Sequence, residues 1–231
     1  LTPNQKFPNE KKLFLPFWAL SFDELIKVTF GELSHEGKAR NIILEKILAA
    51  KTEATTKYHA NQISIDNLTV DSPIPFSLNE LWYDLYGKEF GTYYSDSGKK
   101  PDKENWAYET DQAGNKLTGD AQRGVPPKFK PVKNVKEDPE KINYLPDALN
   151  IRSSLENLGA KLRIPRFDFL LRPGEWMPDS DGKITKDLPD LIKGWIGSDK
   201  PITIFDLSGV PNLILDDVIG RLLRILCDCL F

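Results

Sequence analysis

Apolar residues recur at three- and four-residue steps in several stretches of the chain, which is the spacing of one face of an α-helix. The stretch with the clearest spacing contains Ile42, Ile43, Ile47 and Leu48. We expect Lys46 and Lys51 on the other side of this helix. The pattern therefore predicts an amphipathic helix over 34–55 with its lysines on the polar side.

Two further stretches carry the signal of a helix start. Ser21 with Glu24, and Ser77 with Glu80, each have the capping-box spacing, in which serine accepts an amide hydrogen and glutamate reaches back to the cap amide. A helix is expected after each serine. Helical spacing also predicts helices over 144–158, over 188–196 and from 212 to the end of the chain.

β-Rich stretches alternate with these helices. Strand propensity is high over 63–70 and 166–171, and 202–205 reads Ile-Thr-Ile-Phe, as expected for a strand buried on both faces of a parallel sheet. Leu13 to Leu20 is compatible with either an edge strand or a buried turn. The order of strand, turn and helix at the end of the chain predicts an α/β fold, with a helical portion in the first third.

The middle of the chain has a different composition. Residues 87–143 are rich in Gly, Pro, Lys, Asp and Asn, and their scattered aromatic residues favour an ordered excursion over a disordered linker. We expect a long loop or small insertion here.

Composition narrows the class of protein. The chain has 231 residues, a formal net charge of -3 and 40% hydrophobic residues, enough for one large domain or two small ones. The slightly acidic balance gives no overall signature of nucleic-acid binding. Its two cysteines, Cys227 and Cys229, lie two apart in a predicted helix and point to different faces, so a reducing, cytoplasmic setting is expected. No apolar run is long enough for a membrane span.

Several runs of residues resemble one family. They are Pro16-Phe17-Trp18, the segment from Thr69 to Leu78 (TVDSPIPFSL), Arg166-Phe167-Asp168-Phe169-Leu170, the segment from Ile204 to Pro211 (IFDLSGVP), and Gly220-Arg221-Leu222-Leu223-Arg224. Together they resemble the HerA-type P-loop ATPases. The resemblance implies part of a RecA-like α/β core with an inserted helical subdomain. It places the helical insertion at 1–70, a loop-rich insertion at 71–145 and part of the core at 146–231.

The same resemblance implies a function and partners. HerA-type ATPases are motors that translocate or unwind double-stranded DNA, and they bind ATP and Mg²⁺. They assemble as rings, so a homohexamer is expected. They work with a nuclease in DNA-end repair, or with a nuclease or other effector in antiviral defence, and the sequence does not choose between these. A related conjugation-type motor is a second possibility.

Two motifs that such a motor needs are missing from the chain. It has no Gly-rich loop ending in Lys-Ser or Lys-Thr to hold the phosphates, and no strand that ends in paired acids, because Asp206 is followed by Leu207. The chain also starts without methionine and stops within a helical pattern. We therefore expect a fragment whose P-loop lies before Leu1 and whose paired acids follow Phe231. Alone, it should neither bind ATP tightly nor hydrolyse it.

Asp206, Ser208 and Gly209 form the first candidate site. They follow the predicted strand 202–205, at the edge where open α/β sheets place ligands, which suggests a position near the nucleotide. The alternative, which we favour, is a turn that caps the next helix.

Basic residues suggest two more candidate sites. Lys128, Lys130 and Lys133 interleave with Phe129, and such a loop can contact DNA phosphates and bases, although a solvated surface loop is the favoured alternative. Arg221 and Arg224 lie three apart on the last predicted helix and could reach across a subunit boundary. Such arginines more often pair with acids on the helix surface.

Other chemistry finds no support in the sequence. His35 and His59 lack the ligands or partners of a zinc site or a Ser-His-Asp arrangement, and Asp71 before Ser-Pro is typical of a turn. A rival to the motor is a non-enzymatic interaction or assembly module that keeps the motor fold. It would have no P-loop before Leu1.

Overall fold

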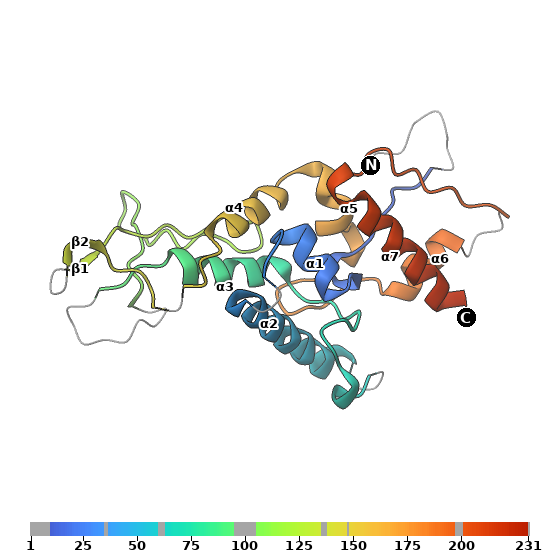
Figure 1. Ribbon diagram of the computed structural model, residues 1–231, viewed down its shortest axis with the longest axis horizontal. Coiled ribbons are helices and arrows are strands. Elements are labelled where there is room, and N and C mark those ends of the chain that lie inside the picture. The colour runs from blue at the N-terminus through green and yellow to red at the C-terminus, as the bar shows by residue number, and fades with distance from the viewer. Residues whose placement is uncertain are drawn as a thin grey trace. The chain divides into compact units, whose positions relative to one another are not determined.

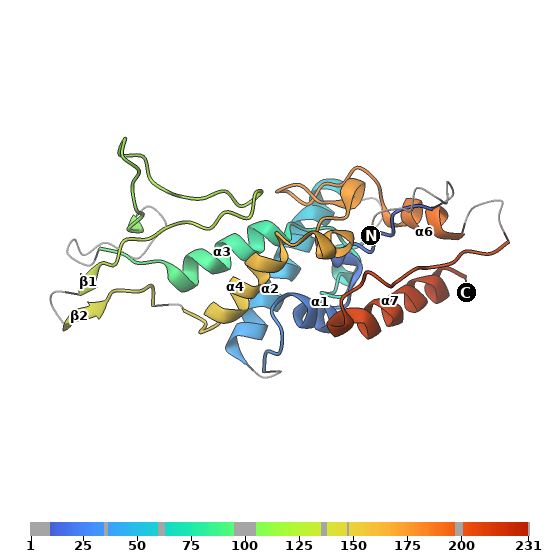
Figure 2. The same cartoon turned by 90° about the horizontal axis from the view of Figure 1, so that it is seen from above.

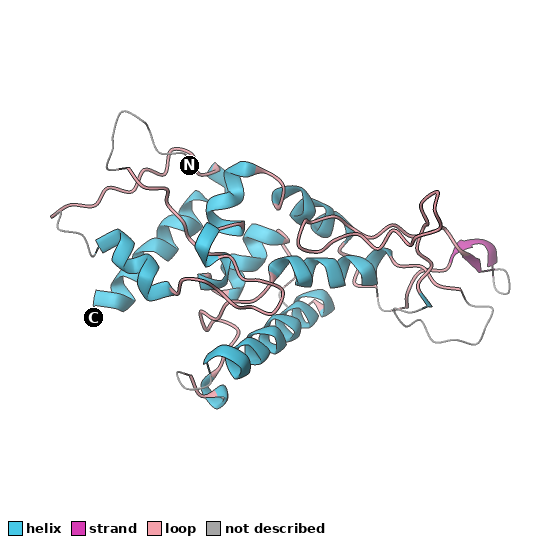
Figure 3. Cartoon of the chain, turned by 180° about the vertical axis from the view of Figure 1, so that it is seen from behind, coloured by secondary structure: helices cyan, strands magenta, loops and turns pink. Residues whose placement is uncertain are grey.

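Helices form where the chain combines apolar spacing with a good start signal, and they make up most of the regular structure. The computed structural model describes residues 10–34, 37–59, 63–94, 105–134, 138–146, 148–196 and 201–230. Figure 1 shows the order of the helices along the chain. In the described residues the strands form one small two-stranded sheet, and the rest is helix and loop (Figure 3).

The regular elements have the following bounds. The α-helices are α1 (Phe22–Thr29), α2 (Lys38–Ala54), α3 (Leu78–Phe90), α4 (Arg152–Lys161), α5 (Asp168–Leu171), α6 (Leu188–Ile196) and α7 (Asn212–Leu230). Short 3-10 turns are Phe17–Ala19, Ile65–Asn67, Pro165–Phe167 and Gly174–Trp176, and a π-helical turn, Thr55–His59, follows α2. Strands β1 (Lys133–Asn134) and β2 (Asp138–Ile142) pair in antiparallel fashion.

The helices predicted from spacing and caps are confirmed. α1 begins after Ser21, whose side chain accepts the Glu24 amide while the Glu24 carboxylate accepts the Ser21 amide at 2.8 Å. α2, α6 and α7 lie within or closely match their predicted ranges, and α3 begins at Leu78, directly after Ser77. The helix predicted over 144–158 begins later, because α4 spans Arg152–Lys161.

Two predicted strands are wrong. The stretch 166–171 is helical, since the 3-10 turn Pro165–Phe167 leads directly into α5 and proline at the start of a helix loses no needed amide hydrogen. The stretch 63–70 contains a 3-10 turn and exposed side chains instead of a ladder. The Leu13–Leu20 run, left open by the sequence, is a buried turn around Phe17–Ala19.

The third predicted strand, 202–205, is extended but has no strand beside it among the described residues. It was expected to be buried on both faces, yet Ile202 is 74% exposed and Ile204 is 86% exposed. A β-rich run becomes a strand only when a neighbour accepts its hydrogen bonds. The expected parallel sheet of a RecA-like α/β core is therefore absent from the described part of the chain.

The chain divides into two compact units that are each discontinuous in sequence. Unit 1 comprises 1–32, 44–77 and 160–231, and unit 2 comprises 33–43 and 78–159. In unit 1, α1 runs beside α7 in both Figure 1 and Figure 2, and ion pairs join them. Buried members of its core include Phe17, Trp18, Ile26, Phe76, Phe169, Leu170, Ile214 and Val218.

Unit 2 is built on α3. The indole of Trp82 is buried and donates a hydrogen bond to the Leu155 carbonyl at 2.9 Å, and Gly159 of α4 leaves room for that ring, since a Cβ there would lie 3.0 Å from Trp82 Cζ2. The described parts of the excursion between α3 and α4 are held by isolated antiparallel bridges, such as Tyr108 with Phe129. The expectation of an ordered excursion is confirmed for 105–134.

Candidate functional site

The first candidate site is a polar turn that leads into α7. The Asp206 carboxylate accepts the Ser208 amide hydrogen at 3.0 Å, and this bond, with one from the Ser208 hydroxyl, lowers the pKa of Asp206. Val210 is buried and its amide donates to the Leu207 carbonyl at 2.9 Å. Asp206, Ser208 and Gly209 are exposed. The geometry is that of a turn before a helix, and its exposed side leaves these residues accessible to a ligand.

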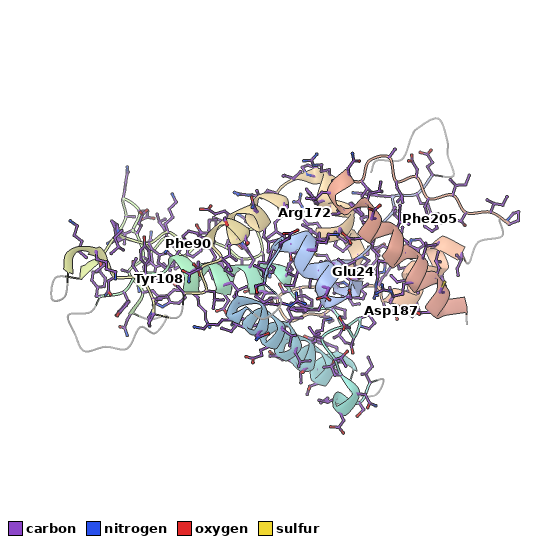
Figure 4. The ribbon with its side chains drawn as sticks, in the orientation of Figure 1. Glu24, Phe90, Tyr108, Arg172, Asp187 and Phe205 are labelled. Carbon is purple, nitrogen blue, oxygen red and sulfur yellow. The ribbon has the colours of Figure 1, made fainter. Side chains whose placement is uncertain are left out.

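The second candidate, the arginine pair, lies on the side of α7 that meets α1. Arg224 Nη1 lies 3.5 Å from Glu24 Oε1, and Lys27 Nζ lies 2.9 Å from Asp217 Oδ2 (Glu24 is labelled in Figure 4). The two ion pairs run in opposite directions, one cation coming from each helix. Arg224 is thus placed as a helix-to-helix partner in unit 1.

Arg221 has a different environment from Arg224. It is only 9% exposed, and its Nε has no hydrogen-bond partner within the described residues. Burial lowers the pKa of its guanidinium, while Glu24 opposes that shift. A reach across a subunit boundary by Arg221 would require it to leave this position, and that role stays a prediction.

Lys51 was assigned from the sequence to the wrong side of its helix. It was expected on the polar side of its helix, but it is 1% exposed. Its Nζ donates to the Val70 carbonyl at 2.6 Å and the Ser72 carbonyl at 2.7 Å, and lies 5.6 Å from the centre of the Phe76 ring. Burial lowers its pKa to about 8, with a smaller lowering from Arg221. The spacing was misassigned, because Lys51 follows Ile43 and Ile47 at four-residue steps and so lies on the buried face. Two backbone carbonyls of a later loop replace water around its ammonium.

Asp71, in the same loop, links it to α1. Its carboxylate accepts the Phe22 amide hydrogen at 2.7 Å, which satisfies a donor at the first turn of α1. It also raises the pKa of Lys51 in opposition to burial. The turn expected at Asp71 is present, with the Ser72 amide bonded to the Thr69 carbonyl at 3.1 Å. Lys51 and Asp71 together fix this loop against α1 and α2.

The third candidate is the lysine stretch of unit 2, which is an extended and hydrogen-bonded segment. The Lys128 carbonyl accepts the Glu109 amide at 2.9 Å, the Lys130 amide donates to the Ala107 carbonyl at 2.8 Å, and the Lys130 carbonyl accepts the Thr92 hydroxyl at 2.6 Å. The backbone of the stretch is therefore held in place, and consecutive side chains point to opposite faces.

Alternation places Lys128 and Lys130 on the face of this segment opposite Phe129. Phe129 stacks on Tyr108 with ring centres 5.2 Å apart and meets Trp106 edge-on at 5.8 Å (Tyr108 is labelled in Figure 4). Lys128 and Lys133 are exposed and Lys130 is half-buried. Tyr108 already stacks on the Phe129 ring, whereas the exposed side chains of Lys128 and Lys133 are accessible to a ligand.

Among the described residues, no group of three or more His, Cys, Asp or Glu side chains is arranged to hold a metal ion. His35 lies outside the described residues. Within the same parts of the chain, none of the helices has the length and apolar character needed to cross a membrane.

The clustering of Lys51, Asp71 and Arg221 had no clear signal in the sequence. The charges around Lys51 are separated along the chain by 20 residues or more, as the numbering shows. The sequence did contain one signal, because Lys51 lies four residues after Ile47 and three before Ala54, on the same face of the helix. A lysine on such a face can be buried only if its ammonium finds hydrogen-bond acceptors.

Comparison with known protein families gives a match over most of the chain. The family described as "Helicase HerA, central domain" matches residues 2–226, which is nearly the whole chain. A search of curated proteins finds no match.

Proposed function

We propose that this chain, which belongs to the HerA helicase central-domain family, is part of an ATP-dependent motor that translocates double-stranded DNA. The match over residues 2–226 is the observation that carries the proposal, because it covers both compact units. The family is one of P-loop ATPases. The resemblance in the runs around Asp71, Asp168 and Asp206 points the same way.

We assign the binding of ATP and Mg²⁺ to the parent protein and not to this chain alone. The reason is that this chain contains neither a phosphate-binding loop nor a strand ending in paired acids. The chain's own contribution near the nucleotide is the exposed turn of Asp206, Ser208 and Gly209. The Asp206 carboxylate, held ionised by its bonds to Ser208, suits contact with a cation or a hydroxyl. In this proposal the 231-residue chain alone does not turn over ATP.

A homohexameric ring in the cytoplasm, with a nuclease or a defence effector as partner, completes the proposed assembly. The family to which the chain belongs usually forms oligomers, which supports self-association in general. The partner would be a nuclease if the protein acts in DNA-end processing, and a nuclease or other effector if it acts in antiviral defence. The motor chemistry would be the same in both cases.

For DNA contact we propose Lys128, Lys130 and Lys133. Their backbone is fixed by neighbouring segments, and two of the three are exposed. Phe129 anchors the stretch through Tyr108 and Trp106. Lysine side chains on a held backbone suit the DNA phosphates, whose neutralisation releases counterions and makes binding dependent on salt.

The test replaces Lys128, Lys130 and Lys133 by glutamine and measures binding of duplex DNA over a range of salt. We expect weaker binding and a salt slope that is smaller by about 1 for each lost phosphate contact. The matched control replaces three exposed lysines of unit 1, Lys11, Lys183 and Lys193, by glutamine. Equal losses in both triple variants would show that only net charge matters and would contradict the assignment.

The missing nucleotide motifs favour one alternative function, that of a non-enzymatic assembly or DNA-docking module with the motor's fold. A parent protein without a Gly-Lys-Ser or Gly-Lys-Thr loop would favour this alternative. ATP turnover that depends on such a loop would exclude it.

A further inference from the structure

Tyr144 is an exposed aromatic residue of unit 2 that lies against a cation of the same unit. It is 39% exposed. The guanidinium carbon of Arg152, at the start of α4, lies 4.3 Å from the centre of the Tyr144 ring and 5.1 Å from the centre of the Phe90 ring (Phe90 is labelled in Figure 4). The Phe90 ring in turn stacks on the Tyr86 ring, with centres 4.2 Å apart. Planar groups therefore follow one another from α3 to Tyr144, which is open to solvent.

Arg152 is held over these rings from α3. Its Nη2 donates to the Glu89 carbonyl at 3.1 Å, and its Nε lies 3.8 Å from Glu89 Oε1. Glu89 is only 2% exposed, and its other carboxylate oxygen accepts the Leu149 amide hydrogen at 2.7 Å. A cation in this position is attracted by the ring electrons. The guanidinium thus supports the Tyr144 ring from one side.

The backbone at Tyr144 is also held. Tyr144 forms an antiparallel bridge with Thr92. The preceding residue, Asn143, donates its backbone amide hydrogen to the Val132 carbonyl at 2.7 Å and its side-chain amide hydrogen to the Tyr93 carbonyl at 3.0 Å. An exposed ring that is fixed in this way loses little conformational freedom on binding, which favours a partner that contacts the ring itself.

Exposed lysines lie close to Tyr144 along the small sheet. Lys133 of β1 pairs with Ile142 of β2, two residues before Tyr144, and Lys141 is next to that pair. Both lysines are exposed. Proteins bind single-stranded nucleic acid with this combination of groups, because ammonium groups contact the phosphates while an aromatic ring stacks on a base. The chemistry of the surface therefore matches a strand with unpaired bases.

We propose that Tyr144 stacks on an unpaired base of DNA while Lys133 and Lys141 contact the phosphates beside it. The inference rests on the DNA contact proposed above for Lys128, Lys130 and Lys133, and it adds unpaired bases to the substrate of that site. Phosphate contacts are common to duplex and single-stranded DNA. Stacking needs a base with a free face, which a single strand offers and the interior of a duplex does not.

The first test compares two labelled oligonucleotides of equal length, an oligothymidylate and an abasic strand, by fluorescence anisotropy. We expect the 231-residue chain to bind the oligothymidylate about tenfold more tightly. Tyr144→Ala should remove this preference and leave binding of the abasic strand unchanged, whereas Tyr144→Phe, which keeps the ring, should retain the preference. The matched control is Tyr58→Ala in unit 1, since Tyr58 is also 39% exposed. It should have no effect.

The outcomes separate this inference from the proposed function. Equal affinities of the wild type for the two oligonucleotides, or a preference that survives Tyr144→Ala, overturns the stacking of Tyr144 on a base. If the triple replacement of Lys128, Lys130 and Lys133 still weakens duplex binding in that case, the DNA contact stands without the base contact. A chain that binds neither duplex nor single-stranded DNA contradicts both proposals.

The second test locates the base. A bound oligonucleotide that carries iodouracil should, on irradiation, form a covalent crosslink to the aromatic ring against which its base lies. Mass spectrometry of the digested product should find this crosslink at Tyr144, and Tyr144→Ala should abolish it. Lys133→Gln with Lys141→Gln should weaken binding of both oligonucleotides while the preference for bases remains. Crosslinks confined to other residues would overturn the proposal.

Discussion

Lys51 shows how one residue can carry an energetic cost inside the fold. Its ammonium group is removed from water and is compensated by two carbonyls, the Phe76 ring and the nearby Asp71 carboxylate. Burial still dominates, so its pKa falls to about 8, below the ordinary value of 10.5. Lysines that remain exposed, such as Lys193 on α6, provide the comparison.

The pKa of Lys51 predicts a distinctive titration. In NMR spectra that follow the lysine Cε and Hε resonances, one lysine should titrate near pH 8, and Lys51→Met should remove that signal. The control Lys193→Met, on the exposed side of α6, should leave the signal near pH 8 in place. A spectrum in which no lysine titrates near pH 8 would contradict the burial of Lys51.

The same residue links stability to pH. The folded chain releases the Lys51 proton near pH 8 and the unfolded chain only near 10.5, so between these values the unfolded chain holds more protons. The free energy of unfolding of the wild type, relative to Lys51→Met, should therefore rise with pH in that window, by roughly 1.4 kcal/mol per unit at most. Below pH 8 the difference should be flat. Urea unfolding of both proteins at several pH values measures it, and a difference that falls with pH would refute the account.

At the scale of elements, two helical glycines have opposite surroundings. A Cβ at Gly87 of α3 would lie 2.6 Å from Cζ3 of the Trp106 ring, whereas a Cβ at Gly194 of α6 would meet no atom within 4 Å. Gly87 is thus where the bridged excursion packs against α3 in unit 2. Gly194 has no such packing role within the described residues.

These surroundings predict opposite effects of the same substitution. Gly87→Ala should destabilise unit 2 by about 1–3 kcal/mol, because the rigid indole must move. Gly194→Ala should stabilise its helix by about 0.5–1 kcal/mol, because alanine loses less backbone entropy. Denaturant unfolding followed by tryptophan fluorescence compares the two. Stabilisation by Gly87→Ala would contradict the packing of Trp106 on α3.

The helices could be predicted from sequence because their signals are local. Ser21 and Glu24 lie three residues apart, and the structure contains both of their hydrogen bonds. Strands were not predictable in the same way. Ile202 to Phe205 has strong β propensity, but a strand needs a neighbour, and the described residues supply none. The run from Arg166 to Leu171 is too short for the spacing of its apolar residues to distinguish a strand from a helix. Pro165 begins a 3-10 turn there, and the run continues as helix.

The candidate sites show the same limit. The turn at Asp206 was predictable because an aspartate accepts an amide two residues later. The burial of Arg221 was not, since it depends on segments distant in sequence. The four-residue step from Ile47 to Lys51 did signal the burial of Lys51, but its acceptors at Val70 and Ser72 come from a distant loop. The interleaving of Lys128 and Lys130 with Phe129 was enough to suggest a DNA-binding loop from the sequence. The stacking of Phe129 on Tyr108 could be known only from the fold.

At the scale of the whole molecule, family membership covers both units, while the chemistry of the family requires groups that this sequence does not contain. We therefore propose that the ATP chemistry belongs to the parent protein.

The most direct test of that assignment is the sequence of the complete reading frame that encodes this chain, confirmed by the intact mass of its product. The account predicts a Gly-rich loop ending in Lys-Ser or Lys-Thr before Leu1 and an apolar strand ending in paired acids after Phe231. A reading frame that encodes neither motif would contradict the motor assignment and leave the interaction module as the better description.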